Sequence, residues 1–128
     1  MTVSTSVTVR PYHDEDYDGV SRLLLAEGWA HALPTLADVD LYGVAYVATS
    51  DGVVGFIRAL SDGYAVAYIA EVVVDPAQRG QGIGRRLVMA VEMAYPTARV
   101  DVLSAQPATG FYDRVGYSAR AGYRKWQQ

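Results

Sequence analysis

The stretch that decides the fold is IAEVVVDPAQRGQGIGRRL, residues 69–87. Three consecutive β-branched residues, Val72–Val74, favour a strand that is buried on both faces. Pro76 has no N–H to give to a sheet and therefore predicts the end of that strand. A glycine-rich loop, residues 80–84, then precedes an apolar pattern with helical spacing. Because unpaired N–H groups at a helix start favour an anion, the stretch predicts a phosphate-bearing ligand near Gly82.

The composition of the chain limits the classes of protein to which it can belong. Its 128 residues suffice for one domain with a core and are too few for two, so a single domain over residues 1–128 is expected. Hydrophobic residues make up 51% and charged residues 20%, which is typical of a globular chain. The net charge of −3 does not indicate a nucleic-acid partner. The absence of cysteine excludes disulfides, a thiol nucleophile and thiolate metal sites.

The sequence also carries no signal for export or for membrane insertion. Residues 1–6 lack the basic flank and the apolar run of a signal peptide. No apolar segment approaches ~18 residues, the length that a membrane-spanning helix needs. A cytoplasmic location without a membrane partner is therefore expected. His13 and His31 lie far apart in sequence and form no ligand pair, so no metal is expected.

The residues before the central stretch predict a strand, two helices and an antiparallel meander. Residues 7–10 alternate as in a short strand, and the acidic segment 14–18 begins a helix that ends near Gly28. A second helix is expected from Thr35, as its N-cap, to Gly43. Three strands then follow at residues 44–49, 53–60 and 64–74, joined by two Asp-Gly turns.

The residues after the glycine loop predict a crossover to a parallel strand. The helix after the loop ends at Pro96, and a strand over residues 99–104 should lie beside the strand 64–74. A last helix is expected over residues 107–115, and residues 117–126 should return as one or two short strands. The predicted fold is α/β (α+β), with a mixed central sheet of six to seven strands flanked by four helices. Its element order is β-α-α-β-β-β-α-β-α-β, and a cleft should open where the two parallel strands diverge.

Two motifs stand at characteristic places in this order. RGQGIG, residues 79–84, follows an apolar strand that ends in Val-Asp-Pro, and FYDRVGY, residues 111–117, places an aromatic pair before a Gly-aromatic turn. Together they resemble the GNAT superfamily of N-acetyltransferases, whose core signature is Gln/Arg-x-x-Gly-x-Gly/Ala. The resemblance covers nearly the whole chain. Residues 62–76 are further similar to small bacterial members that are distantly similar to plant serotonin N-acetyltransferase.

Two other families with glycine loops do not fit these residues. A dinucleotide-binding fingerprint needs Gly-x-Gly-x-x-Gly, and Arg85 stands at the place of its last glycine. A P-loop needs a lysine and a hydroxyl residue, and neither follows Gly84.

The resemblance implies that acetyl-CoA binds as a cosubstrate along the central stretch. Its pyrophosphate should accept hydrogen bonds from the backbone of the loop, and the side chains of Arg79, Arg85 or Arg86 could meet the phosphates. For Arg85 and Arg86, exposed positions on a helix are an equally good interpretation. The pantetheine arm should pair with the edge of Val72–Val74, where an N–H near Val73 would polarise the thioester carbonyl. The expected cofactor-binding residues are Val72, Val73, Val74, Arg79, Gly80, Gln81, Gly82, Ile83, Gly84 and Arg85.

Two side chains are candidates for moving protons. An amine with a pKa of ~10.4 must lose a proton before it attacks, and Glu71 is the nearest candidate base, directly or through a water. The alternative is that Glu71 forms an ion pair on the sheet face. The resemblance places Tyr112 near the CoA sulfur as the acid, the alternative being a core tyrosine. A phenol of pKa ~10 giving its proton to a thiolate of ~8.5 is uphill by ~2 kcal/mol.

The acceptor pocket is expected to be aromatic. Trp29 and Tyr68 are the predicted substrate-binding residues, and ordinary packing at the edge of the core is the alternative for each. Weaker candidates are His31, Tyr64, Trp126 and Asp101. The net acidic charge mildly favours a cationic acceptor.

These features predict an acetyl-CoA-dependent N-acetyltransferase that acts on a primary amine by direct attack in a ternary complex. No covalent intermediate is expected, because the chain has no cysteine and no Ser-His-Asp pattern. The alternative is a non-catalytic module that senses acyl-CoA, and a third interpretation is an unrelated nucleotide-phosphate-binding domain. The acceptor stays open between a small molecule and a peptide amine, and the family resemblance allows a homodimer.

Overall fold

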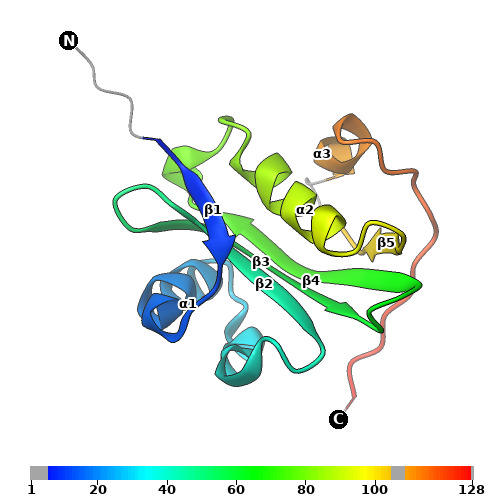
Figure 1. Cartoon of the computed structure of the whole chain (residues 1–128), viewed down its shortest axis with the longest axis horizontal. Helices are drawn as coiled ribbons and strands as arrows, with labels where there is room; N and C mark the ends of the chain where they lie inside the picture. Colours follow the sequence, from blue (N-terminus) through cyan, green and yellow to red (C-terminus); the bar gives the residue numbers. More distant parts are fainter. Residues whose placement is uncertain (1–5, 105–108, 128) are drawn as a thin grey trace.

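The computed structural model describes residues 6–104 and 109–127, and they form a mixed sheet with helices on both faces (Figure 1). The strands lie side by side in sequence order, β1-β2-β3-β4-β5. The first four are antiparallel to their neighbours, and β5 is parallel to β4, as the predicted crossover requires. The strands are β1 (Thr8–Pro11), β2 (Gly43–Thr49), β3 (Val53–Ser61), β4 (Val66–Val74) and β5 (Arg99–Val102).

Helices cover both faces of the sheet. The α-helices are α1 (Tyr17–Ala26), α2 (Ile83–Ala94) and α3 (Thr109–Arg114), and the 3-10 helices are η1 (Asp14–Asp16), η2 (Ala30–Asp38) and η3 (Pro76–Gln78). Figure 1 shows α1 on one side of the sheet and α2 on the other. In the part of the chain that the structure describes, no helix has the length and apolar character that crossing a bilayer requires.

The sheet separates two hydrophobic cores. On one face, α1 and η2 pack on β2 and β3 around Phe56 and Leu24, both fully buried. On the other face, α2 packs around Ile57 and Leu87. The predicted apolar stripe of α2 is buried at Ile83, Leu87, Val88 and Val91. Residues three or four apart share one helix face, which explains why this stripe faces the sheet.

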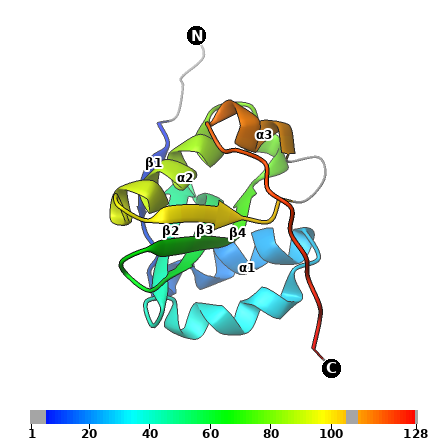
Figure 2. The same cartoon turned by 90° about the vertical axis from the view of Figure 1, so that its right-hand side faces the viewer.

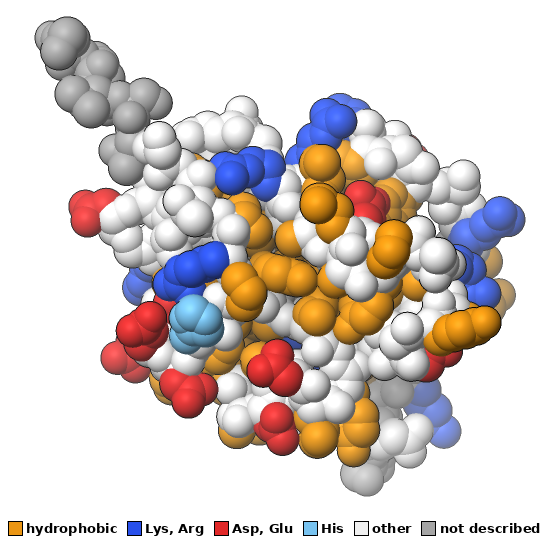
Figure 3. Space-filling model, viewed as in Figure 1, with side chains coloured by type: hydrophobic (Ala, Val, Ile, Leu, Met, Phe, Trp, Pro, Cys, Tyr) orange, Lys and Arg blue, Asp and Glu red, His pale blue; other side chains and the backbone are white. Residues whose placement is uncertain are grey.

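The acidic segment at the start of α1 forms an ionic link to β1. Acidic side chains gather over this end of the molecule in Figure 3. Asp16 is buried and accepts two hydrogen bonds of 2.8 Å from the Arg10 guanidinium. The hydrogen bonds from Arg10 hold the pKa of Asp16 below its usual range, and they outweigh burial, which acts in the opposite direction. The link fixes α1 on its face of the sheet.

A β-bulge changes the direction of the side chains in β4. Arg58 of β3 pairs with Glu71, whereas the next residue, Ala59, pairs with Ile69, so Ala70 is an extra residue in β4. Ile69 consequently packs in the α2 core and Val73 in the α1 core, although both have the same parity along the chain. The bulge therefore places Glu71 on the face that carries α1 and η2.

Beyond the bulge, part of β4 has a free edge. β5 pairs with β4 only from Val66 to Ile69. Beyond Ile69, no residue in the described ranges pairs with residues 70–74 on the β5 side. The predicted divergence of the parallel strands is therefore present, and it begins at the bulge.

The structure corrects two sequence-based predictions. The second helix is the 3-10 helix η2, which begins at Ala30 rather than at Thr35; Thr35 lies inside it, where its hydroxyl donates to the Ala32 carbonyl. Five strands are present in the described residues, instead of six or seven, because residues 117–127 contain no strand. Gly116, with a φ of +95°, turns the chain out of α3, and Figure 2 shows the tail running past β5 toward η2. Of the last predicted helix, residues 105–108 lie outside the described residues.

Candidate active site

The glycine loop makes an unobstructed start for helix α2. Gly80 and Gly82 have φ values of +82° and +81°, which side chains rarely adopt. Gly82 is the N-cap of α2, and no side chain caps the helix there. Gly84 lies in the first turn of α2 beside Phe111 of α3, whose ring would be 3.4 Å from a Cβ at this position, an ordinary contact distance. The first N–H groups of α2 therefore stay available to an anion.

A cavity of about 630 Å³, which we call the loop cavity, lies between this helix start, the free edge of β4 and α3. The residues that line it include Val72, Val73, Val74, Arg79, Gly80, Gly82, Ile83, Gly84 and Arg85. Of the predicted cofactor-binding residues, only Gln81 does not line it, and Gln78 does. The described structure thus brings the other predicted residues together around one space.

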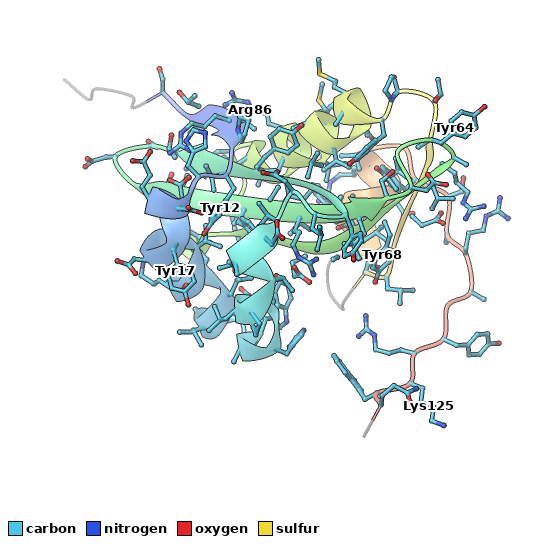
Figure 4. The ribbon with its side chains drawn as sticks, turned by 60° about the horizontal axis from the view of Figure 1, so that its bottom comes forward. Tyr12, Tyr17, Tyr64, Tyr68, Arg86 and Lys125 are labelled. Atoms are coloured by element: carbon cyan, nitrogen blue, oxygen red, sulfur yellow. The ribbon has the colours of Figure 1, made fainter. Side chains whose placement is uncertain are left out.

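The arginines near the loop cavity have different partners. Arg79 donates from Nη2 to Glu27 Oε1 at 2.8 Å and from Nε to the Val74 carbonyl at 3.0 Å. Arg86 donates to the Val7 carbonyl at 2.7 Å and lies next to β1, away from the cavity (Figure 4). Arg85 and Arg114 both line the cavity, and within the described residues neither has a carboxylate partner. Among the arginines of the described lining, they are therefore the two whose charge is not already paired with a carboxylate.

Tyr112 of α3 lines the loop cavity. It is only 7% exposed, and its ring makes edge contacts with Phe111 and Tyr117, at centroid distances of 4.9 and 5.6 Å. Burial, followed by the neighbouring Tyr68, raises the pKa of Tyr112 to about 12. The phenol therefore keeps its proton at neutral pH. Tyr117 fixes this arrangement, because its hydroxyl donates to Glu92 of α2 at 2.9 Å.

Glu71 forms a buried ion pair. Its two carboxylate oxygens accept hydrogen bonds from Nε and Nη2 of Arg58, at 2.7 and 2.9 Å. The side chains are 9% and 13% exposed. The ion pair that the sequence left as an alternative to a base is therefore present, and the pair faces a cavity.

That second space, of about 800 Å³, is here called the tail cavity because residues of the C-terminal tail form one wall. Trp29 and Tyr68, the two predicted substrate-binding residues, both line it, together with Glu71. Trp29, Val72 and Tyr112 line both the tail cavity and the loop cavity, so the two spaces adjoin at Tyr112.

The weaker acceptor candidates divide into two groups. His31 and Trp126 line the tail cavity, and their rings make an edge contact at 5.3 Å between centroids. Tyr64 is 81% exposed and does not line either cavity. Asp101 also lies outside both cavities, where it accepts a hydrogen bond from Arg99 at 2.9 Å.

Several lining residues were not foreseen from the sequence. Arg114 lies one turn after Gly110 in α3. It belongs to the aromatic motif, but nothing in that motif indicated that its charge would face the cavity. Arg58 sits in the meander, where only its register with Glu71 reveals a role. Arg124 belongs to a segment that was expected to form a strand. Only the spacing of three residues between Phe111 and Arg114, which share a helix face, could have indicated its place.

Comparison with known proteins agrees with this geometry. The acetyltransferase (GNAT) domain family matches residues 41–119, which include β2–β5, the glycine loop and Tyr112. The chain belongs to the GNAT acetyltransferase family. The family is one of acetyltransferases that use acetyl-CoA.

The individual relatives share limited sequence identity with this chain. A glucosamine 6-phosphate N-acetyltransferase from Trypanosoma brucei brucei is 35% identical over 60 residues, which are 44% of this chain. The matched part spans 41% of that protein's length. Two GNAT-fold structures superpose over nearly the whole chain at identities that show the fold alone. One is a GNAT family acetyltransferase from Streptococcus pneumoniae TIGR4, with a TM-score of 0.80, 24% identity and coverage of 96% of this chain and 98% of that chain.

The other superposed structure is AAC(6')-Iy in complex with a CoA bisubstrate analogue. Its TM-score is 0.76 and its identity 14%, with coverage of 97% of this chain and 99% of that chain.

Proposed function

We propose that this enzyme transfers an acetyl group from acetyl-CoA to a primary amine by direct attack in a ternary complex. The donor would occupy the loop cavity and the acceptor the tail cavity. The observation that carries the proposal is the junction of the two cavities at Tyr112. A donor and an acceptor entering from opposite sides would meet there without an intermediate carrier.

The residues of the loop cavity fit acetyl-CoA. The pantetheine arm contains two amides, which can pair with the free edge of β4 at residues 72–74 as a further strand would. The pyrophosphate suits the open N-terminus of α2 behind Gly82. Arg85 and Arg114 supply positive charge at the same cavity. The donor therefore finds backbone donors along its arm and cations near its phosphates.

The chemistry needs two proton movements. The amine nitrogen forms a bond to the thioester carbonyl carbon, the C–S bond breaks, the amine loses a proton and the thiolate gains one. We propose that an N–H near Val73 polarises the carbonyl and that Tyr112 gives the proton to the sulfur. Glu71 is proposed to take the proton of the amine through a water, because it lines the tail cavity while Arg58 holds both of its oxygens.

The helix start offers a test of donor binding. Gly82→Asp should raise the Kd of acetyl-CoA about 10-fold, because it adds a negative charge at the helix end that the pyrophosphate needs. Aspartate tolerates a positive φ better than most residues, so folding should be retained. Isothermal titration calorimetry measures the change. Gly63→Asp is the matched control, since Gly63 has a φ of +77° but lies outside the loop cavity. An equal Kd in both variants would contradict the proposed phosphate position.

The activity itself is tested by release of free CoA thiol. We expect thiol release from acetyl-CoA with at least one member of a panel of amines, and a matching acetylated product by mass spectrometry. The panel should include glucosamine 6-phosphate and an aminoglycoside, which the names of the relatives suggest. Binding of acetyl-CoA without thiol release from any amine would favour the non-catalytic sensor. Absence of acetyl-CoA binding at millimolar concentration would overturn the proposal.

A further inference from the structure

We infer that the acceptor carries an anionic group, a phosphate or a carboxylate, which binds beside Arg124 and His31 in the tail cavity. The inference rests on the proposed function, because it names the class of amine that this cavity takes. It is carried by the charges of the residues that line the cavity and by their existing partners.

The only carboxylate among the described lining residues is already engaged. Arg58, Glu71 and Arg124 are the charged side chains of the described lining, apart from a histidine. Both oxygens of Glu71 accept from Arg58. An additional ammonium on the acceptor would therefore find no carboxylate without a partner in this lining. Desolvating such a charge without compensation is unfavourable, so a polycationic acceptor fits poorly.

Arginine donors, in contrast, remain available to an anion. The guanidinium of Arg124 lies 5.7 Å from the ring centroid of Trp126, and that ring contacts His31. Among residues 6–104 and 109–127, no carboxylate pairs with Arg124. Arg58 uses Nε and Nη2 for Glu71, and within the same residues its Nη1 makes no hydrogen bond. A phosphate or a carboxylate can use such N–H groups in pairs.

The stacking around Trp126 gives Arg124 a defined position. A cation over an indole face is favourable, and the indole is in turn held against His31 of η2. Figure 2 shows the tail passing from α3 along the open side of the sheet toward η2. The tail thus carries its cation to the wall of the tail cavity.

This local charge reverses the expectation drawn from the net charge of −3. Much of the acidic excess sits at the start of α1, at Asp14, Glu15, Asp16 and Asp18, none of which lines the tail cavity. Charges farther away than about 8 Å are largely screened at physiological salt. The lining residues, rather than the whole chain, therefore decide the preferred charge of the acceptor.

The inference is tested with pairs of amines that differ by one anion. Glucosamine with glucosamine 6-phosphate tests a phosphate, and tyramine with tyrosine tests a carboxylate. We expect kcat/KM for the anionic member of at least one pair to be about 10-fold higher at low salt. The pair that shows the preference identifies the anion. Equal or better rates for the members that lack the anion, in both pairs, would overturn the inference.

Variants of the tail assign the preference to Arg124. Arg124→Gln should reduce the preference about 5- to 10-fold by raising KM, with kcat at saturation retained. Arg124→Glu should favour glucosamine over its phosphate. Lys125→Gln is the matched control, because Lys125 does not line the cavity and its side chain points away from the sheet (Figure 4). An unchanged preference in Arg124→Gln would overturn the assignment.

A binding measurement keeps the inference separate from the proposed function. Titration of glucosamine 6-phosphate and of tyrosine into the protein with CoA present, followed by NMR, reports binding without turnover. We expect binding of at least one of them to weaken in Arg124→Gln and to be unchanged in Lys125→Gln. An inactive enzyme that shows this pattern would refute only the proposed function. An active enzyme with equal affinity for amines with and without the anion would refute only the inference.

Discussion

Replacing Tyr112 with phenylalanine is expected to lower kcat about 100-fold while leaving the Kd of acetyl-CoA nearly unchanged. The change removes one hydroxyl and keeps the edge contacts with Phe111 and Tyr117. No hydrogen bond joins the Tyr112 hydroxyl to another described residue, so its loss leaves no partner unsatisfied there. The free energy of unfolding should therefore change by less than about 1 kcal/mol.

Steady-state thiol release, calorimetry with acetyl-CoA and urea unfolding measure the three quantities. Tyr64→Phe is the matched control, since Tyr64 is 81% exposed and lies outside both cavities. A kcat close to that of the unmodified enzyme would show that Tyr112 only packs at the end of α3. A large rise in Kd without a change in kcat would instead make it a donor-binding residue.

The high pKa of Tyr112 defines how it can act. With the phenol near 12 and a thiol near ~8.5, complete proton transfer to a free thiolate is uphill by about 5 kcal/mol. This is more than the ~2 kcal/mol that an unperturbed phenol would require. A hydrogen bond that strengthens as the C–S bond breaks is therefore more favourable than transfer after cleavage. A general acid works below its pKa, so ionisation of Tyr112 should not lower kcat between pH 7 and about 10.

The sequence predicts the donor side of the site better than the acceptor side, for a physical reason. The loop cavity is built from one continuous stretch, in which the glycines at 80, 82 and 84 and the valine strand carry local signals. Gln81 was expected there and Gln78 was not, because the direction of each residue depends on the turn at η3.

The tail cavity depends on contacts between distant segments. Arg58 meets Glu71 only because an extra residue, Ala70, shifts the register between β3 and β4. Sequence periodicity does not locate such a bulge, which reverses the faces of all residues that follow it. The strand predicted over residues 117–126 is absent for a related reason. The aromatic residues of the tail favour a strand locally, but they line a cavity beside His31 instead of pairing with β5.

Glu71→Ala is expected to lower the free energy of unfolding by about 3–5 kcal/mol, because it leaves the buried guanidinium of Arg58 without its partner. Arg58→Ala should have a comparable cost, since it leaves the carboxylate of Glu71 alone. Urea unfolding of both single variants measures these values. A loss below about 1 kcal/mol would contradict the burial and the bidentate geometry of the pair.

The double variant Arg58→Met/Glu71→Leu should recover most of that stability. It removes both charges together, and apolar side chains of similar size can replace a buried ion pair at little cost. The recovery matters because it separates folding from chemistry. Activity measured in a well-folded double variant reports what the carboxylate does for the reaction.

If Glu71 accepts the amine proton, the stable double variant should still have a kcat about 100-fold below that of the unmodified enzyme. Its rate should also rise about tenfold per pH unit from pH 7 to 9, since only amine that is already unprotonated can attack. The loss of Arg58 does not itself create this pH dependence, because a guanidinium stays protonated throughout this range. A double variant with full kcat and an unaltered pH profile would make Glu71 a structural partner of Arg58 alone. The amine would then lose its proton to water in the tail cavity, and the ion pair would serve to hold β4 at its bulge.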